Sequence, residues 1–230
     1  MTGGGARTTG ARTASARTTP PSLTGYWIVL ALIALSYALC AAQVGPDPSS
    51  TAFMVQLVTV AVILRVAEVN RTARRAGWIV LAIAGLAVVV VYFTEAQGRV
   101  LDMTLSGASA LAYLVAPIAV VAHQVRRERV DAQSLLAAVS AYVLVGMFFT
   151  FLYNFVSLVT GLPTFGEGED ASLTSQLFFS FTTLTTTGYG NVVPAGALGQ
   201  SVAIAEAITG QLFLVIAVAR VVAGWEHAKR

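Results

Sequence analysis

A segment near the C-terminal end of the chain has the residue types needed to hold a dehydrated cation. It reads TTLTTTGYGN over residues 182–191. Gly188 and Gly190 can adopt φ values that are closed to other residues, so successive backbone carbonyls can point to one side of the chain. Thr186 adds a hydroxyl oxygen next to these carbonyls. Stacked oxygens of this kind can replace the water shell of a cation that enters a narrow path.

The residues around this segment predict that it lies inside a membrane. Residues 160–197 are too apolar for a surface loop and too short for two crossings. Asp170 and Ser172 can cap a short helix over about residues 173–183. Pro194 then stops any helix before the next apolar stretch. Because non-helical backbone at membrane depth is tolerated only inside protein or beside a water-filled path, we expect a re-entrant helix and a loop that lines a pore.

The rest of the chain supplies the membrane helices that must position this loop. Of the 230 residues, 56% are hydrophobic and only 11% are charged, and the mean hydropathy is +0.75. A helix needs about 17 to 25 apolar residues to cross a bilayer. Six stretches qualify, at about residues 26–42, 52–67, 78–93, 105–122, 135–159 and 198–222. The predicted fold class is an all-α integral membrane protein with six transmembrane helices and the re-entrant segment between the last two.

Basic residues in the short loops indicate the orientation of these helices. Arginines precede the first stretch and follow the second and fourth, and Lys229 and Arg230 follow the sixth. Acidic residues dominate the other side, where Arg99 is the only arginine. We therefore expect both termini to lie in the cytoplasm, and the predicted location is a bacterial plasma membrane. The arginine clusters are interpreted as topology signals and lipid contacts, not as a nucleic-acid site.

The string at residues 182–191 resembles the signature of the potassium channel family, whose usual form is TVGYG. The resemblance extends from about Leu135 to Gly224. It implies that four identical chains close around one axis, with K⁺ as the permeant ion. It also implies that stacked K⁺ sites are formed by the Thr186 hydroxyl and by the backbone carbonyls of Thr186, Thr187, Gly188, Tyr189 and Gly190.

Several residues are expected to support this loop from behind. Tyr189 should point away from the path and pack against Phe178, Phe179 and Phe181. Glu206 is an ionisable group at bilayer depth, where an unpaired charge costs at least about 2.5 to 3.5 kcal/mol. A tie from Glu206 to the re-entrant helix is favoured over direct contact with the ion. The family often has Asp in place of Asn191, and Val or Ile in place of Thr187. The predicted support set is Phe178, Phe179, Thr182, Asn191 and Glu206.

The last apolar stretch is expected to line the inner part of the path. Gly210 lies where the family often has a glycine at which this helix bends, but a small residue can equally serve close helix packing. Further along, an apolar constriction can close by dewetting. The candidate hinge and gate residues are Gly210, Leu214, Ala217, Val218 and Val221.

The first four stretches resemble a voltage-sensor domain in number and topology, without its arginine ladder. No Arg or Lys occurs between Leu105 and Ala122, so steep voltage dependence is not expected. Arg65 and Glu68 are expected to form a salt bridge near the cytoplasmic boundary. Residues 1–24 are small, polar and basic, which predicts a disordered tail, with a cleaved signal peptide as the competing interpretation. The predicted domains are this tail, a four-helix domain over residues 25–130 and a pore domain over residues 131–230.

The sequence thus predicts a potassium-selective channel subunit that conducts K⁺ passively and is weakly voltage-dependent or leak-like. Its expected partners are further copies of itself, K⁺ and the lipid bilayer. Two alternatives remain, a non-conducting regulatory subunit and a cation transporter. An enzyme is not expected, because no metal-ligand spacing, nucleophile–base pair or phosphate loop is present in the sequence.

Overall fold

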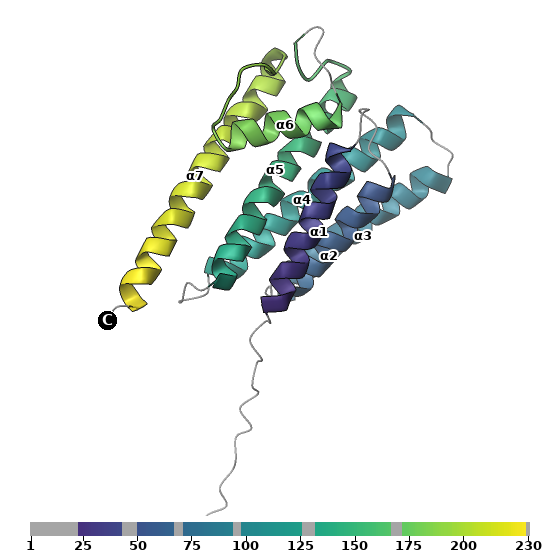
Figure 1. The fold of residues 1–230 in the computed structure, drawn as a ribbon. Coiled ribbons are helices and arrows are strands. Elements are labelled where there is room, and N and C mark those ends of the chain that lie inside the picture. Colours follow the sequence, from purple (N-terminus) through teal and green to yellow (C-terminus); the bar gives the residue numbers. More distant parts are fainter. Residues whose placement is uncertain are drawn as a thin grey trace, which may run out of the picture.

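Seven α-helices make up the part of the chain that a computed structural model describes, which comprises residues 23–42, 50–66, 71–93, 98–125, 132–166 and 172–228 (Figure 1). The helices are α1 (Leu23–Ala41), α2 (Ser50–Val66), α3 (Arg71–Phe93), α4 (Arg99–Val125), α5 (Ala132–Thr160), α6 (Leu173–Leu184) and α7 (Gly196–Ala228). Within these ranges no strand occurs, and the prediction of an all-α fold is confirmed.

Three of the described helices are long and apolar enough to cross a membrane. Their candidate spans are Arg99–Ala122 in α4, Gln133–Thr160 in α5 and Gly196–Arg220 in α7. The apolar parts of α1, α2 and α3 are shorter, namely Trp27–Ala41, Phe53–Arg65 and Gly77–Val90. The chain is therefore a multi-pass membrane protein by length and composition, and the crossings by α1, α2 and α3 stay a prediction.

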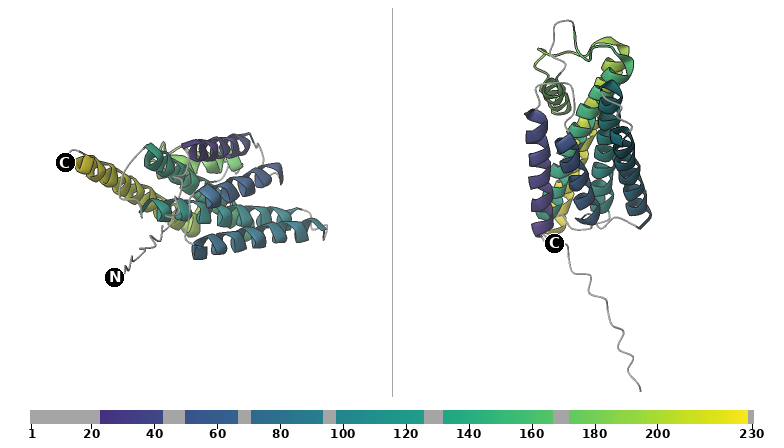
Figure 2. Two further views of the ribbon diagram at one scale, coloured as in Figure 1. Left: turned by 90° about the horizontal axis from the view of Figure 1, so that it is seen from below. Right: turned by 90° about the vertical axis from the view of Figure 1, so that its right-hand side faces the viewer.

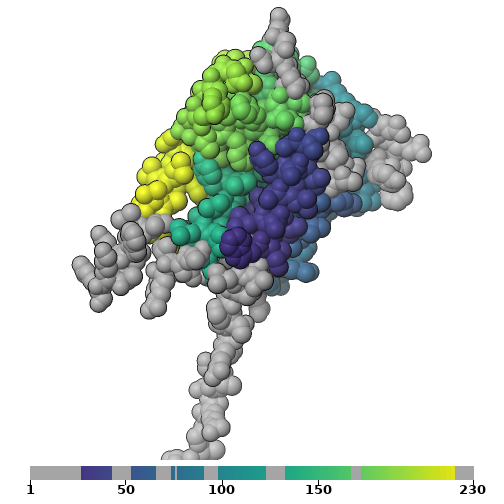
Figure 3. All heavy atoms as spheres, viewed as in Figure 1, coloured from purple at the N-terminus to yellow at the C-terminus, as the bar shows by residue number. Residues whose placement is uncertain are grey.

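The helices form a bundle with one outlying member. Helices α1 to α5 lie side by side, whereas α7 lies mainly against α5 and α6 in the described part of the chain and diverges from the bundle toward its C-terminal end (Figures 1 and 2). The space-filling view places the yellow atoms of α7 at the edge of the molecule (Figure 3). Only 11% of the α7 span is buried, so most of this helix is free to contact lipid or another copy.

The most extensive helix contact joins α4 to α5. Gly107 of α4 meets the ring of Phe155 of α5, since a Cβ atom at this glycine would lie 3.0 Å from that ring. Small residues of this kind allow neighbouring membrane helices to approach closely. The first four helices are thereby attached to the α5 of their own chain.

The short helix α6 lies across one end of α5 and α7 (Figure 1). Ser172 is the N-cap of α6, as predicted, and its side chain accepts a hydrogen bond from the Ser175 amide. Asp170, the other predicted cap residue, lies outside the described residues. An aromatic cluster of Phe149, Tyr153, Phe165 and Phe179 supports α6 against α5. A short helix is therefore present where the re-entrant helix was predicted, and it ends at Leu184, whereas its re-entry into a membrane stays a prediction.

Candidate functional site

The segment that follows α6 turns its amides back toward the helix it has just left. The Thr186 amide donates to the Thr183 carbonyl at 3.0 Å. The Thr187 and Gly188 amides both donate to the Thr182 carbonyl, at 2.8 and 3.1 Å. These carbonyls belong to the last turn of α6, where they have no partner within the helix. The end of α6 and the segment after it therefore satisfy each other's hydrogen bonds.

Residues 185–190, called the carbonyl segment from here on, alternate in backbone handedness. Thr186, Gly188 and Gly190 have φ values of 59°, 51° and 77°, whereas Thr187 and Tyr189 do not have positive φ. In an ordinary extended chain successive carbonyls point to opposite sides. When residues with positive φ alternate with residues without it, every second peptide plane is turned over relative to an extended chain. Successive carbonyls can then face the same side.

Thr186 is unusual within this segment. Among the described residues it is the only non-glycine residue with positive φ. A β-branched residue in this region is strained, at a cost of roughly 1–3 kcal/mol, and such strain clusters at functional sites. The six residues of the carbonyl segment are also exposed in the single chain. Nothing in the described part of the chain donates a hydrogen bond to the carbonyls of residues 186–190. These oxygens are therefore available to a cation.

The phenylalanines predicted to pack behind the segment do not all contact Tyr189. Tyr189 stacks on Phe178, with ring centroids 5.8 Å apart and an angle of 11° between the planes. Phe179 instead packs edge-on against Tyr153 and Phe165. Among the ring contacts of the described residues, Tyr189 therefore meets only Phe178 of the three predicted phenylalanines. The other two side chains leave α6 in different directions and meet other rings.

Thr182 and Asn191 flank the carbonyl segment. Thr182 contributes its backbone carbonyl to the segment, while its hydroxyl donates to the Phe179 carbonyl in its own helix at 3.0 Å. Asn191 directly follows the last residue of the segment and is exposed.

Glu206 joins three helices behind the carbonyl segment. Its side chain is fully buried. The Ser180 hydroxyl of α6 lies 2.5 Å from Oε1, and the Tyr153 hydroxyl of α5 donates to Oε2 at 2.8 Å. Ser180 Oγ also lies 2.8 Å from the Gly146 carbonyl oxygen of α5. Both carboxyl oxygens are hydrogen-bonded to side chains of other helices, so Glu206 ties α7 to α5 and α6.

Gly210 packs directly on the end of α6. A Cβ atom at this position would overlap the Leu184 carbonyl oxygen. The Tyr142 hydroxyl donates to the same oxygen at 2.9 Å. Helix α7 continues without interruption from Gly196 to Ala228. Of the two interpretations of this glycine, the structure therefore supports close packing over a bend.

The other candidate gate residues lie further along α7. Leu214 and Val218 are exposed, and Ala217 is partly buried. The side chain of Val221 lies outside the described part. The single chain brings none of these residues together with the carbonyl segment, since they follow it on α7 by several turns.

The four-helix part contains a different charge contact from the one predicted. The guanidinium of Arg65 lies over the Trp78 ring, 5.8 Å from its centroid. Glu68, the predicted partner of Arg65, lies outside the described residues. On the other side of the bundle, Arg99 Nε donates to the Leu158 carbonyl at 2.8 Å and so joins the start of α4 to the end of α5.

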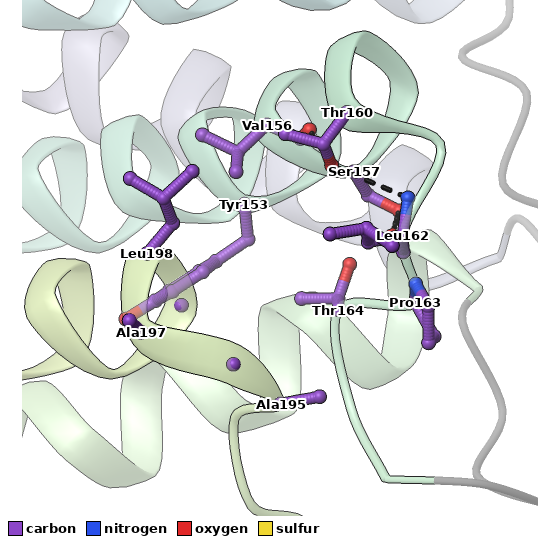
Figure 4. A pocket seen from close by; sticks show the side chains of 12 residues that line it. Tyr153, Val156, Ser157, Thr160, Leu162, Pro163, Thr164, Ala195, Ala197 and Leu198 are labelled. Atoms are coloured by element: carbon purple, nitrogen blue, oxygen red, sulfur yellow. Dashed lines mark hydrogen bonds between the residues drawn. The ribbon is translucent and has the colours of Figure 1, made fainter.

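A cavity of about 180 Å³ lies between the end of α5 and the start of α7 (Figure 4). Its lining includes Tyr153, Ser157, Thr160, Pro163, Thr164 and Leu198 and contains no charged side chain. The described residues also contain no group of three or more His, Cys, Asp or Glu side chains that could hold a metal ion. The carbonyl segment is therefore the candidate ion site that the described residues offer.

Sequence reasoning did not find Gly146, Tyr142, Tyr153 or Ser180, which position α6 and Glu206. Their residue types are ordinary for an apolar helix. Only Gly146, a glycine inside the α5 sequence, indicated a position of close packing.

The part of the chain that carries this site is similar to known proteins. A family model described as "Ion channel" matches residues 137–224, which include most of α5, all of α6, the carbonyl segment and most of α7. "Protein LctB" of Bacillus caldotenax is 33% identical to this chain over 111 residues, which cover 43% of this chain and 82% of that protein. The matched region contains the site described above, and the chain therefore belongs to the ion channel family.

Proposed function

We propose that this chain is one subunit of a potassium-selective channel that conducts K⁺ passively, with the carbonyl segment as its selectivity filter. The observation that carries the proposal is the alternation of left-handed residues at Thr186, Gly188 and Gly190 directly after α6. It allows the carbonyls of residues 186–190 to face one path while the amides of residues 186–188 are held by α6. Rings of such carbonyls replace the hydration shell of K⁺.

Two further features favour a cation in this path. The C-terminal end of α6 leads into the carbonyl segment, and the helix macrodipole places about half a negative charge at such an end. The Thr186 hydroxyl adds another oxygen at the inner end of the row of carbonyls. In the proposal, the bound ions lie between oxygen layers contributed by Thr186, Thr187, Gly188, Tyr189 and Gly190.

The exposure of the carbonyl segment supports assembly from several copies. Polar, non-helical backbone at membrane depth must be enclosed by protein or face water. One chain leaves residues 185–190 exposed and buries little of α7. Four copies around a common axis would enclose a water-filled path between their carbonyl segments and cover part of α7. We therefore propose a homotetramer in the bacterial plasma membrane, with both termini in the cytoplasm.

Gating is proposed to depend little on voltage. Helix α4 has no Arg or Lys between Leu105 and Ala122, so the four-helix domain carries no charge ladder that could move in the field. Leu214, Ala217, Val218 and Val221 remain the proposed apolar constriction on α7. A weakly voltage-dependent or leak-like conductance is proposed from the absence of a charge ladder.

The central test is a reversal potential measured with purified protein in liposomes under opposed K⁺ and Na⁺ gradients. We expect a value close to the K⁺ equilibrium potential. Equal permeability to Na⁺ and K⁺ would refute the proposed selectivity. Coupled movement of a second solute would favour a transporter, and absence of any flux would favour a regulatory subunit.

Two glycine-to-alanine substitutions, one in the carbonyl segment and one outside it, then test the filter assignment. Gly188→Ala forces a Cβ into φ +51°, which costs about 1–2 kcal/mol and displaces the carbonyls. We expect loss of K⁺ conduction with assembly preserved. Gly98→Ala is the matched control, because Gly98 has φ +72°, has no atom near its absent Cβ and lies outside the filter. Normal conduction by Gly188→Ala, or equal loss in both variants, would remove the assignment.

A further inference from the structure

Helix α1 touches α6 directly, although the two are far apart in the sequence. The ring of Tyr37 meets the ring of Phe181 edge-on, with centroids 5.5 Å apart and an angle of 85°. Toward the other end of α6, the Thr174 hydroxyl donates to the Ala41 carbonyl at 3.3 Å. Two views show α1 beside α6, and the space-filling view shows the purple atoms of α1 against green atoms (Figures 1, 2 and 3).

Phe181 is held from its other side by a glycine. A Cβ atom on Gly146 of α5 would lie only 2.7 and 2.8 Å from two atoms of the Phe181 ring. The ring therefore occupies space that exists only because residue 146 has no side chain. Phe181 is thus enclosed between the α5 backbone and Tyr37 of α1, which restrains sideways movement of α6 at this point.

The enclosed residue lies next to the groups that hold the carbonyl segment. The Phe181 carbonyl accepts hydrogen bonds from the Thr185 amide at 3.0 Å and from the Thr185 hydroxyl at 2.7 Å. The next carbonyl, of Thr182, holds the amides of Thr187 and Gly188. A shift or rotation of α6 at Phe181 therefore moves the acceptors that orient the carbonyl segment.

We propose that Tyr37 is a positioning residue for the ion path, so that the four-helix domain acts on conduction through direct contact between α1 and α6. The ring of Tyr37 keeps Phe181 against Gly146 and thereby keeps the carbonyl segment in its conducting arrangement. This inference rests on the proposed function. It adds that the four-helix domain can act on the carbonyl segment through the contact of α1 with α6, and not only through residues 126–131, which connect α4 to α5. The side chain of Tyr37 is 42% exposed, so part of it remains open to the surroundings of α1.

The test compares three variants of the full chain. Tyr37→Ala removes the ring, Tyr37→Phe keeps the ring and removes only the hydroxyl, and Leu35→Ala trims another exposed side chain on α1. An aromatic pair of this geometry contributes enough to change an equilibrium about 2- to 10-fold. We expect Tyr37→Ala to lower the single-channel open probability by about this factor. Tyr37→Phe and Leu35→Ala should match the wild type.

A second measurement does not depend on ion selectivity. Hydrogen exchange measured by mass spectrometry on a peptide that covers residues 185–190 reports the amides held by Thr182. We expect about 2- to 10-fold faster exchange of this peptide in Tyr37→Ala and unchanged exchange in the two other variants. If Tyr37→Ala does not fold, Tyr37→Leu removes the aromatic contact while keeping an apolar side chain.

The outcomes separate this inference from the proposed function. Wild-type exchange and open probability in Tyr37→Ala would overturn the positioning role, whatever the selectivity. Equal effects of Tyr37→Phe and Tyr37→Ala would also overturn it, because the ring contact would not be the cause. A non-selective wild type whose residues 185–190 exchange faster in Tyr37→Ala would remove the K⁺ proposal and leave the positioning role supported.

Discussion

Substitution of Gly210 by alanine adds one methyl group at the closest contact between α7 and α6. The new Cβ would overlap the Leu184 carbonyl oxygen and would lie 3.1 Å from both the carbonyl carbon and Cδ1 of Leu184. The carbonyl group cannot rotate away cheaply, because it belongs to the α6 backbone and accepts a hydrogen bond from Tyr142. The clash is therefore relieved only if α6 and α7 separate.

The cost of this separation follows from two contributions. Overpacking of a close contact costs about 1–3 kcal/mol. Loss of the hydrogen bond from Tyr142 to Leu184 adds about 1 kcal/mol. The sum of about 2–4 kcal/mol corresponds to a decrease in Tm of roughly 4–16 °C for a chain of this size. Since Leu184 directly precedes the carbonyl segment, K⁺ flux should decrease as well.

Thermal unfolding in detergent and K⁺ flux in liposomes would be measured on the same preparations. Gly85→Ala is the matched control, because this α3 glycine has nothing within 4 Å of its absent Cβ, and its Tm should stay close to the wild-type value. A Gly210→Ala protein with wild-type Tm and reduced open probability would refute the packing argument and favour a hinge. Tyr142→Phe should cost less in the Gly210→Ala background than alone, because the two effects share the Leu184 carbonyl.

Substitutions at two other positions test further contacts. Glu206→Ala leaves the buried hydroxyl of Tyr153 without its partner and should destabilise the protein by about 2–4 kcal/mol. Glu206→Gln should destabilise it by about 1 kcal/mol or less, because the amide can accept a hydrogen bond from Tyr153 and donate one to Ser180. Thermal unfolding of the two variants decides this, and equal damage would show that the carboxylate charge is required. Arg99→Gln removes the hydrogen bond to Leu158 at an exposed position and should lower Tm by only about 2–4 °C, with selectivity unchanged. An altered reversal potential in this variant would contradict a purely structural role of Arg99.

Much of the local structure could be predicted from the sequence. The apolar stretches correspond to helices, and the Ser172 cap and the Leu173 start of α6 follow from short-range residue preferences. The left-handed conformations at Gly188 and Gly190 follow from the absence of a side chain. These features depend on residues close together in the chain, so the sequence by itself determined the all-α class and the place of the candidate ion site.

Only the tertiary structure decided which side chains meet. Glu206 finds Tyr153 at a separation of 53 residues and Ser180 at 26, and Phe181 turns toward Tyr37 although Tyr189 was its predicted contact. A helix that is apolar on all sides carries no stripe to show which face packs inward, and α1, α5 and α7 are of this kind. The rotation and crossing of such helices result from close packing around small residues such as Gly146 and Gly210, which only the assembled bundle defines.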